Sequence, residues 1–395
     1  MLDEGLLAEL LTQQGQRLLA DAALAAPDEA TFLAVSQRLS RTAPERLTRA
    51  AVEQAILRTR AAEKFALAGS MFFTRDALEQ ATAEPVSTYR AARFRQAQLV
   101  FDLGCGIGGD TLALARESNV VSIDREPLLL RILQQHAAIH HVAERVFPIQ
   151  GDLLSPAWSW PRGSLAFADP ARRSGGRRLH RVEAYQPPLS AILRLLPTLR
   201  GMAVKLSPAV DLATLDGSAA EVEFISLGKE LKEAVLWLGS LRSVARRATV
   251  LPGPHSLTGE EPAVADVRPL GEYLYEPDPS VLRAGLVRCL GRRIAAGQID
   301  PTIALLTSDV LQNTPFATTF RLLDAMPFSR KRLQSVLDQR HAGSVTIKKR
   351  GSAVDIEMLS RGLRLRGEGD VTVLLTRAAG DRLILVLERV HADKV

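Results

Sequence analysis

The stretch from Phe101 to Asp110 constrains the fold of this chain more than any other segment. It reads FDLGCGIGGD, so that a short apolar strand over 99–103 runs through an acid into a turn with four glycines. Glycine permits positive φ and leaves no Cβ in the way of a ligand, and the start of the next helix offers free N–H groups. The pattern predicts a nucleoside cofactor site at the end of a parallel strand.

Two cofactors compete for this turn. Gly104, Gly106 and Gly109 satisfy the G-x-G-x-x-G pattern of dinucleotide sites, and Asp124 follows at the spacing of a ribose-binding acid. A pyrophosphate would be repelled by Asp102, which stands two residues before the first glycine. S-adenosylmethionine carries a sulfonium and an ammonium group, so the same acid attracts it. The charge of the site therefore favours the cationic cofactor.

The sequence D-x-G-x-G-x-G resembles motif I of the class I S-adenosylmethionine-dependent methyltransferases, with the members Asp102, Gly104, Gly106 and Gly108. Asp124 ends the expected second strand, where it can accept hydrogen bonds from both ribose hydroxyls. The same residue is also suited to cap the helix that follows it. A third strand ends before Asp152 and Leu153, and there the resemblance implies contacts with the adenine.

The fourth strand, SLAFAD, leads into Asp169 and Pro170, and the reaction is expected there because ligands bind at the carboxyl ends of the strands in an open parallel sheet. The motif resembles the Asp-Pro-Pro-aromatic motif of methyltransferases that act on exocyclic amines. In that motif the acid and a proline carbonyl accept the hydrogens of the amine. This chain departs from the pattern, since Ala171 replaces the second proline and Arg172 replaces the aromatic residue. We expect Asp169 and Pro170 to be the catalytic residues.

The run D-P-A-R also resembles the fourth motif of RNA uracil-carbon methyltransferases. Those enzymes need a cysteine nucleophile just after the fifth strand, because the uracil carbon reacts poorly without covalent activation. This chain has KLSP over 205–208, and its two cysteines, Cys105 and Cys289, lie elsewhere. Carbon methylation by that route is not expected.

Cationic residues surround the predicted acceptor site. Arg172 and Arg173 begin a run of Arg and His that extends to 181, and such a run suits a phosphate or carboxylate at the mouth of the site. Lys205 and Ser207 follow the fifth strand at the same edge. We take these four as candidate substrate-binding residues. A solvated basic loop, or for Lys205 a side chain that reaches out to water, is the structural alternative.

The remaining pattern predicts the architecture. Residues 221–239 read as a hairpin, and class I methyltransferases end their sheet with such an antiparallel strand, whereas a dehydrogenase would continue with βα units. The first ninety residues read as helices, one of them running from Pro44 to about Gly69. The segment just before the first strand is expected to cover the cofactor. Residues 246–262 read as a linker rich in Pro and Gly, followed by a smaller α/β unit.

Composition agrees with a multidomain globular protein. The chain has 395 residues, of which 46% are hydrophobic and 24% charged. It has no apolar run near about 18 residues, and acids stand at its start where a secretory signal carries lysines, so we expect no membrane association and a cytoplasmic location. Two cysteines without ligand spacing predict neither a disulfide nor a metal site.

The order of the segments along the whole chain resembles bacterial class I methyltransferases with C-terminal ferredoxin-like and THUMP-like domains. The later motifs that carry this resemblance are YLYEPDPSVLRAG and a closing KKRG…LRGEGD. The resemblance implies an α/β protein: a Rossmann-like, seven-stranded methyltransferase core, an N-terminal helical domain and a small C-terminal α+β domain. The expected domains are 1–89 (helical), 90–248 (methyltransferase), 265–320 (ferredoxin-like) and 321–395 (THUMP-like).

THUMP domains present tRNA to an attached modifying enzyme. The resemblance therefore implies that the substrate is RNA, either tRNA or rRNA. The net charge is +6, and residues 328–366 hold ten Lys and Arg against three acids. Such a basic face suits a polyanion. Aromatic residues make up only 5% of the chain, so we expect recognition through phosphates and shape rather than through stacked bases.

Our interpretation is a methyltransferase that acts on a base nitrogen of RNA and binds the RNA through its basic C-terminal domain. Two alternatives stay open. The first is a methyltransferase for a protein or a small anionic metabolite, with the arginines after Pro170 as a clamp. The second is a protein that binds S-adenosylmethionine and RNA but has lost catalysis through its altered fourth motif.

Overall fold

The computed structural model describes residues 2–155, 159–171, 173–174, 177–178, 181–215, 219–260, 262 and 264–390, with the backbone alone for 173–174 and 177–178. The chain divides into two compact units. One comprises Met1–Ala220 and Ala234–Ser243, and the other Glu221–Glu233 and Val244–Val395. The finer division into four domains stays a prediction.

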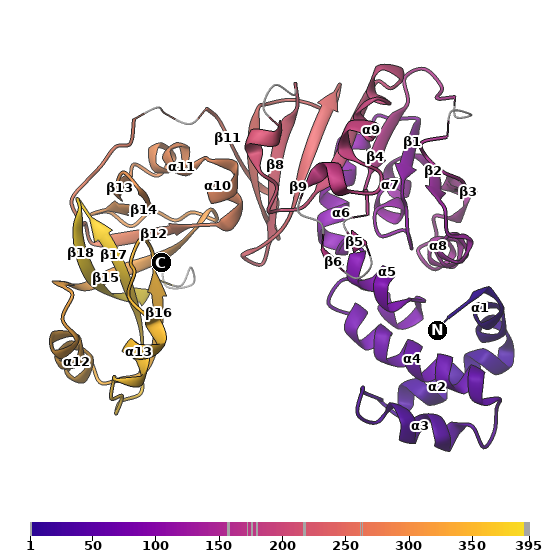
Figure 1. Ribbon diagram of the computed structural model, residues 1–395, viewed down its shortest axis with the longest axis horizontal. Coiled ribbons are helices and arrows are strands. Elements are labelled where there is room, and N and C mark those ends of the chain that lie inside the picture. Colours follow the sequence, from indigo (N-terminus) through magenta and orange to yellow (C-terminus); the bar gives the residue numbers. More distant parts are fainter. Residues whose placement is uncertain are drawn as a thin grey trace. The chain divides into compact units, whose positions relative to one another are not determined.

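The first unit begins with six helices (Figure 1): α1 (Glu4–Leu11), α2 (Gln13–Leu24), α3 (Phe32–Leu39), α4 (Glu45–Ala61), α5 (Arg75–Gln80) and α6 (Glu84–Ala91). Helix α4 packs against α1, α2 and α3, and one face of it is buried. Its predicted start is confirmed, since Pro44 is the N-cap, but its predicted end is wrong. The helix ends at Ala61. Beyond it, Lys64 Nζ donates hydrogen bonds to backbone carbonyl groups at the end of α5.

A parallel sheet follows in the order β3-β2-β1-β4-β7, and its strands lie where the sequence predicts them. The strands are β1 (Leu99–Leu103), β2 (Asn119–Asp124), β3 (Val146–Gln150), β4 (Leu165–Ala168) and β7 (Gly201–Leu206). The longer connecting helices are α7 (Thr111–Glu117), α8 (Pro127–Ile139) and α9 (Leu189–Leu193). Strands β1, β4 and β7 are almost entirely buried, which explains their continuous apolar sequences.

The predicted hairpin is confirmed as β8 (Glu221–Leu227) and β9 (Glu230–Gly239). Its two turn residues, Gly228 and Lys229, both have positive φ, as a tight hairpin turn requires. The later part of β9 belongs to the first unit and pairs antiparallel with β7. The sheet of the first unit therefore ends in an antiparallel strand, as the resemblance implies.

The segment predicted as a linker over 246–262 is instead largely strand. Residues Arg246–Leu251 form β10, parallel to β8, and His255–Thr258 form β11, antiparallel to β10. Only the Pro-Gly-Pro run between them is a turn. The prediction failed because it gave more weight to the glycine and prolines of this turn than to the short buried run over 248–251. Helix α10 (Pro279–Ala284) packs on β8 and β10.

The rest of the second unit is a seven-stranded sheet in the order β13-β14-β12-β15-β18-β17-β16. Its strands are β12 (Tyr273–Pro277), β13 (Gly297–Asp300), β14 (Ile303–Ser308), β15 (Ala317–Pro327), β16 (Ala342–Lys349), β17 (Gly369–Ala378) and β18 (Asp381–Arg389). Its helices are α11 (Val287–Arg293), α12 (Arg330–Gln339) and α13 (Ile356–Arg361). Leu333 and Leu337 of α12 and Leu359 of α13 enter one apolar core with β17 and β18. In the described part of the chain, no helix has the length and apolar character needed to cross a membrane.

Candidate functional site

The glycine loop after β1 forms part of the wall of a cavity in the first unit. Gly104 and Gly106 have φ of +82° and +54°, in the left-handed region that favours glycine. A Cβ on Gly106 would meet nothing within 4 Å, whereas one on Gly104 would lie 3.2 Å from the carbonyl oxygen of Asp169. The loop therefore leaves room for a ligand at Gly106 and packs against the end of β4 at Gly104.

The cavity has a volume of about 380 Å³. Its walls come from the ends of β1, β2 and β4, from the segment Thr74–Thr82 that includes α5, and from Gln186 and Pro187. Part of the segment before the first strand thus lines the cavity, and its cover over the cofactor stays a prediction. The predicted site residues that the cavity brings together are Gly104, Gly106, Asp124, Leu153, Asp169 and Pro170.

Asp102 lies beneath the glycine loop rather than on the cavity wall. Its side chain is buried, and Oδ2 accepts a hydrogen bond from Thr111 Oγ1. Burial, together with the nearby Asp110 carboxylate, raises the pKa of Asp102 to about 8. Within the described part of the chain, its Oδ1 has no hydrogen-bond partner. The acid that favoured a cationic cofactor is therefore a buried group with one unused acceptor.

Asp124 stands at the end of β2 and lines the cavity. Its Oδ2 accepts a hydrogen bond from the Gly106 backbone N–H at 2.8 Å, and its Oδ1 accepts one from Glu126 N at 3.0 Å. The N-cap of α8 is Glu126, so the predicted capping role of Asp124 is wrong. The carboxylate instead fixes the glycine loop while it faces the cavity.

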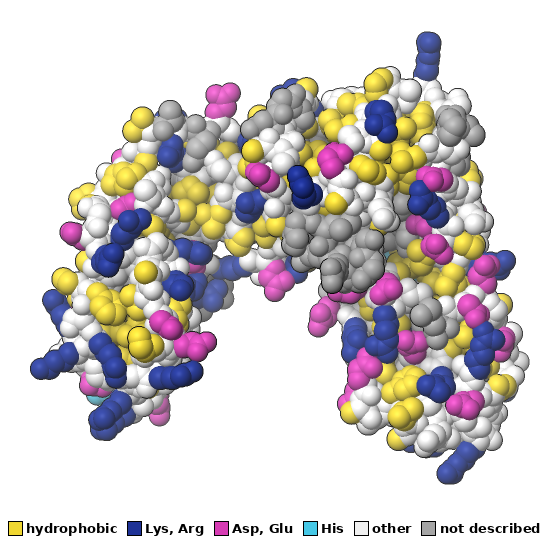
Figure 2. All heavy atoms as spheres, in the orientation of Figure 1, with side chains coloured by type: hydrophobic (Ala, Val, Ile, Leu, Met, Phe, Trp, Pro, Cys, Tyr) yellow, Lys and Arg dark blue, Asp and Glu magenta, His cyan; other side chains and the backbone are white. Residues whose placement is uncertain are grey.

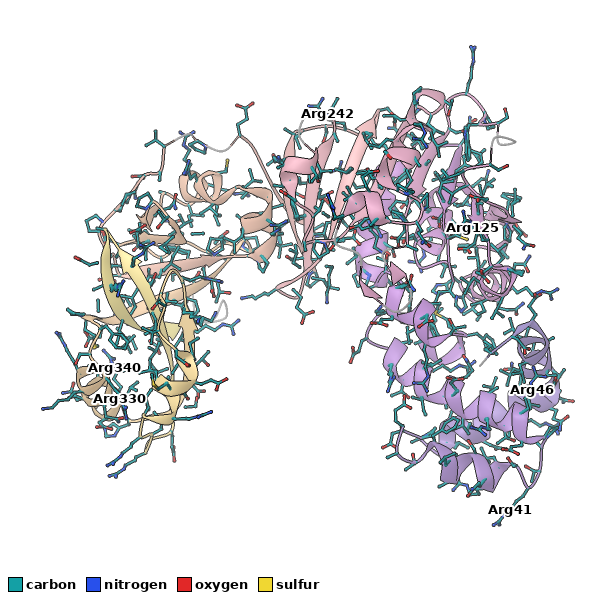
Figure 3. All side chains as sticks on the ribbon, in the orientation of Figure 1. Arg41, Arg46, Arg125, Arg242, Arg330 and Arg340 are labelled. Atoms are coloured by element: carbon teal, nitrogen blue, oxygen red, sulfur yellow. The ribbon has the colours of Figure 1, made fainter. Side chains whose placement is uncertain are left out.

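Asp152 and Leu153 are placed differently. Leu153 is buried and lines the cavity, but Asp152 does not line it. Its Oδ2 accepts a hydrogen bond of 2.6 Å from Arg125, a residue at the cavity edge that is labelled in Figure 3. Of the two residues predicted to contact adenine, the structure brings only Leu153 to the cavity.

Buried polar contacts connect Asp169 with the N-terminal segment. Lys205 Nζ donates to Asp169 Oδ2 at 2.6 Å and to Thr82 Oγ1 at 2.8 Å. Thr82 Oγ1 donates in turn to Asp110 Oδ2 at 3.0 Å, and Asp110 is ion-paired with the buried Arg90. Lys205 is only 3% exposed, so the alternative in which it reaches out to water is wrong.

The structure does not bring the other predicted substrate-binding residues, Ser207, Arg172 and Arg173, to the cavity wall in its described part. Ser207 is buried, its backbone N–H donates to Tyr185 Oη at 3.3 Å, and it does not line the cavity. Arg172 lies outside the described residues. Arg173 belongs to the short strand β5 (Arg173–Ser174), which pairs with β6 (Arg177–Arg178), and only its backbone is described.

Among the residues of this site that were not predicted from the sequence are Thr82, Asp110, Gln186 and Pro187. Asp110 closes the glycine loop and Thr82 belongs to the segment expected to cover the cofactor, so position along the chain was the available signal for both. Gln186 and Pro187 reach the cavity because Ala171 and Gln186 exchange backbone hydrogen bonds. No local pattern indicates that pairing.

A second hollow, of about 930 Å³, lies in the second unit between α12 and residues 362–367. Gln334 fixes its wall, since the amide donates to Arg364 O at 2.7 Å and accepts from Arg364 N at 2.8 Å. We call this hollow the basic groove, and its charged or imidazole side chains are Arg330, Lys331, Asp338, His341, Arg364 and Arg366. Figure 2 shows Lys and Arg gathered around α12, and Figure 3 labels Arg330 and Arg340 at the two ends of this helix.

Three family models match parts of the chain. The model for RNA cap guanine-N2 methyltransferases matches residues 97–194, and a THUMP domain-like model matches residues 317–389. A model for a domain of unknown function matches residues 3–61. The first match spans the glycine loop, Asp169 and Gln186.

Whole-length comparisons agree with these matches. The chain is 37% identical over 347 residues to an uncharacterized S-adenosylmethionine-dependent methyltransferase of Mycobacterium tuberculosis, in strains CDC 1551 / Oshkosh and ATCC 25618 / H37Rv. The match covers 84% of this chain and 93% of the relative. A crystal structure of a Porphyromonas gingivalis W83 protein assigned to the methyltransferases covers 99% of this chain and 100% of that chain, with a TM-score of 0.75 and 22% identity. This second likeness concerns the fold.

Proposed function

Because the chain belongs to the S-adenosylmethionine-dependent methyltransferases and carries a THUMP-like domain at its C-terminus, we propose that it methylates a base nitrogen of RNA, either tRNA or rRNA. The observation that carries the proposal is the position of Asp169 and Pro170. They stand at the end of β4 on the cavity wall, inside the stretch that matches the RNA cap guanine-N2 methyltransferases.

S-adenosylmethionine is the methyl donor of this family, and the cavity has features that suit it. Gly106 leaves open space at the loop, Asp124 presents a carboxylate for the ribose, and Leu153 offers an apolar contact for the adenine. We assign the cofactor to this cavity, with Gly104 and Gly106 beside its methionine half. Gly108, the third predicted glycine, does not line the cavity and packs against Leu133 of α8.

The bound cofactor supplies a methyl group whose carbon–sulfur bond breaks with the electron pair left on sulfur. The chain has to place the acceptor nitrogen so that its lone pair forms the new carbon–nitrogen bond in line with that bond. Lys205 occupies Asp169 Oδ2, and Oδ1 has no hydrogen-bond partner among the described residues. Asp169 Oδ1 and the Pro170 carbonyl oxygen therefore accept the hydrogens of the amine, and the proton that nitrogen loses leaves by Asp169 Oδ1.

We assign RNA binding to the basic groove. Its four Lys and Arg side chains and His341 face a single acid, Asp338. Arginine forks and lysine ammonium groups both bind phosphate oxygens, and counterion release makes such binding strongly dependent on salt. The THUMP domain-like match covers this groove, which supports RNA as the polyanion.

A methyl-transfer assay tests the proposal. Labelled S-adenosylmethionine is incubated with the protein and with total RNA, protein or small-molecule extract from cells that lack the gene. We expect label in RNA alone, and no label in any pool with the Asp169→Ala variant. We expect that variant still to bind S-adenosylmethionine in calorimetry, which would show that it folds. Label in the protein or small-molecule pool instead of RNA contradicts the proposal.

A further inference from the structure

A backbone pairing places a second segment beside the predicted catalytic residues. Ala171 N donates to Gln186 O at 2.9 Å, and Gln186 N donates to Ala171 O at 3.0 Å. This pairing closes the base of the loop between the two residues, so that Gln186 and Pro187 line the same cavity as Asp169 and Pro170. The acceptor end of the cavity is therefore built from two segments that lie sixteen residues apart along the chain.

The second segment adds apolar side chains next to the fourth motif, which lacks the second proline and the aromatic residue. An Asp-Pro-Pro-aromatic motif would offer a flat surface to a base, but here Ala171 follows Pro170. Pro187 and Ile192 line the cavity together with Pro170 and Ala171, and these four side chains are apolar. Such a wall packs against the face of a planar ring, since proline and alanine leave no polar atom there.

Gln186 is the uncharged polar side chain of this second segment. It is exposed, it lines the cavity, and in the described part of the chain its amide makes no hydrogen bond. A glutamine amide offers one acceptor oxygen and two donor hydrogens in one plane. It can therefore bind two neighbouring groups on the edge of a base, as glutamine does when it binds bases in a bidentate manner.

We propose that Gln186 is a specificity-determining residue that binds the edge of the acceptor base while Pro170, Ala171, Pro187 and Ile192 pack against its face. This inference rests on the proposed RNA methylation and names the chemistry of its acceptor: a planar nitrogen heterocycle with a donor and an acceptor beside the reacting amine. Asp169 and the Pro170 carbonyl then hold the amine itself.

Two variants test this proposal with total RNA from cells that lack the gene as the substrate. Gln186→Ala removes the amide, and Gln186→Met keeps the length of the side chain but no donor or strong acceptor. Each is expected to lower kcat/KM for RNA by about 10-fold to 100-fold, because buried groups of the base lose their partners. The Kd for S-adenosylmethionine should stay within about twofold of wild type, since this segment lies at the acceptor end.

Gln37→Ala is the matched control, because Gln37 is exposed on α3 and does not line the cavity. It should leave kcat/KM unchanged. Wild-type kinetics in Gln186→Met would show that the amide is not used, and would overturn the inference while leaving RNA methylation intact. If the wild-type protein transfers no label to RNA, the proposed function fails first, and this inference fails with it.

Discussion

Lys205 Nζ lies 2.6 Å from Asp169 Oδ2, with the two side chains 4% and 21% exposed. The lysine lies in β7 and the aspartate directly follows β4, and these are neighbouring strands of the parallel sheet. Thr82 Oγ1 is the second acceptor of the ammonium group. The predicted catalytic acid is therefore held by a buried cation that also contacts the N-terminal segment on the cavity wall.

Replacing Lys205 with methionine should destabilise the protein strongly. The variant leaves the Asp169 carboxylate without its counter-charge, and breaking a buried ion pair from one side typically costs about 3 kcal/mol. Urea unfolding monitored by circular dichroism measures the free energy of unfolding. The double variant Lys205→Met with Asp169→Asn should recover part of the loss, because the unpaired charge is gone. Equal stability of wild type and Lys205→Met contradicts the buried pair.

The Asp102 carboxyl should make stability fall as the pH rises. Burial raises its pKa from the ordinary 3.8 to about 8, so the folded state keeps a proton that the unfolded state has already released. Between about pH 4 and pH 8 this group therefore lowers the free energy of unfolding progressively as the pH rises. Asp102→Asn, which does not titrate, should gain stability relative to wild type as the pH rises from 5 to 7. Urea unfolding at both pH values checks this, and a gap that does not change with pH contradicts it.

Two glycine variants separate backbone strain from cofactor binding. Gly106 and Gly163 both have positive φ, and a Cβ on either would meet nothing within 4 Å. Alanine at each position should cost about 1 kcal/mol of stability. Gly106→Ala alone should also raise the Kd for S-adenosylmethionine by at least about tenfold, because its Cβ takes space in the cavity. Equal cofactor affinity of the two variants in calorimetry would place the cofactor elsewhere.

Charge removal in the basic groove should weaken RNA binding without changing cofactor binding. We expect Lys331→Ala with Arg366→Ala to raise the Kd for tRNA and to reduce the slope of log K against log salt by about 1 to 2. Arg38→Ala with Arg41→Ala removes the same charge from exposed positions near α3 and serves as the control. Filter binding at several salt concentrations measures both. Equal slopes for the two double variants contradict phosphate binding in the groove.

The local part of the site could be predicted from the sequence. The strand, acid and glycines of FDLGCGIGGD are contiguous, so β1, its turn and the placement of Asp124 at the end of β2 follow from spacing alone. The hairpin with Gly228 at its turn is equally local. A short sequence pattern is therefore sufficient to predict those parts of the site whose geometry depends only on local backbone conformation and on the order of the strands.

The contacts between distant residues could not be predicted. Lys205 is 36 residues from Asp169 and 123 residues from Thr82, and its burial depends on how three segments pack. Asp152 was expected at the adenine, but the neighbouring Arg125 binds it instead, and a sequence does not show which of two exposed partners prevails. The positions of Asp169 and Asp152 therefore depend on side-chain pairs with Lys205 and Arg125, which the spacing of the motifs does not indicate.

The most direct test of the account is mass spectrometry of RNA nucleosides. RNA from cells that lack the gene is incubated with S-adenosylmethionine and either the wild-type protein or Asp169→Ala, then digested and compared with RNA from wild-type cells. We predict one nucleoside methylated on a base nitrogen, present in wild-type cells, absent without the gene, restored by the wild-type protein and not by the variant. Identical nucleoside profiles in all samples, or a methyl group on a base carbon or ribose oxygen, would contradict the account.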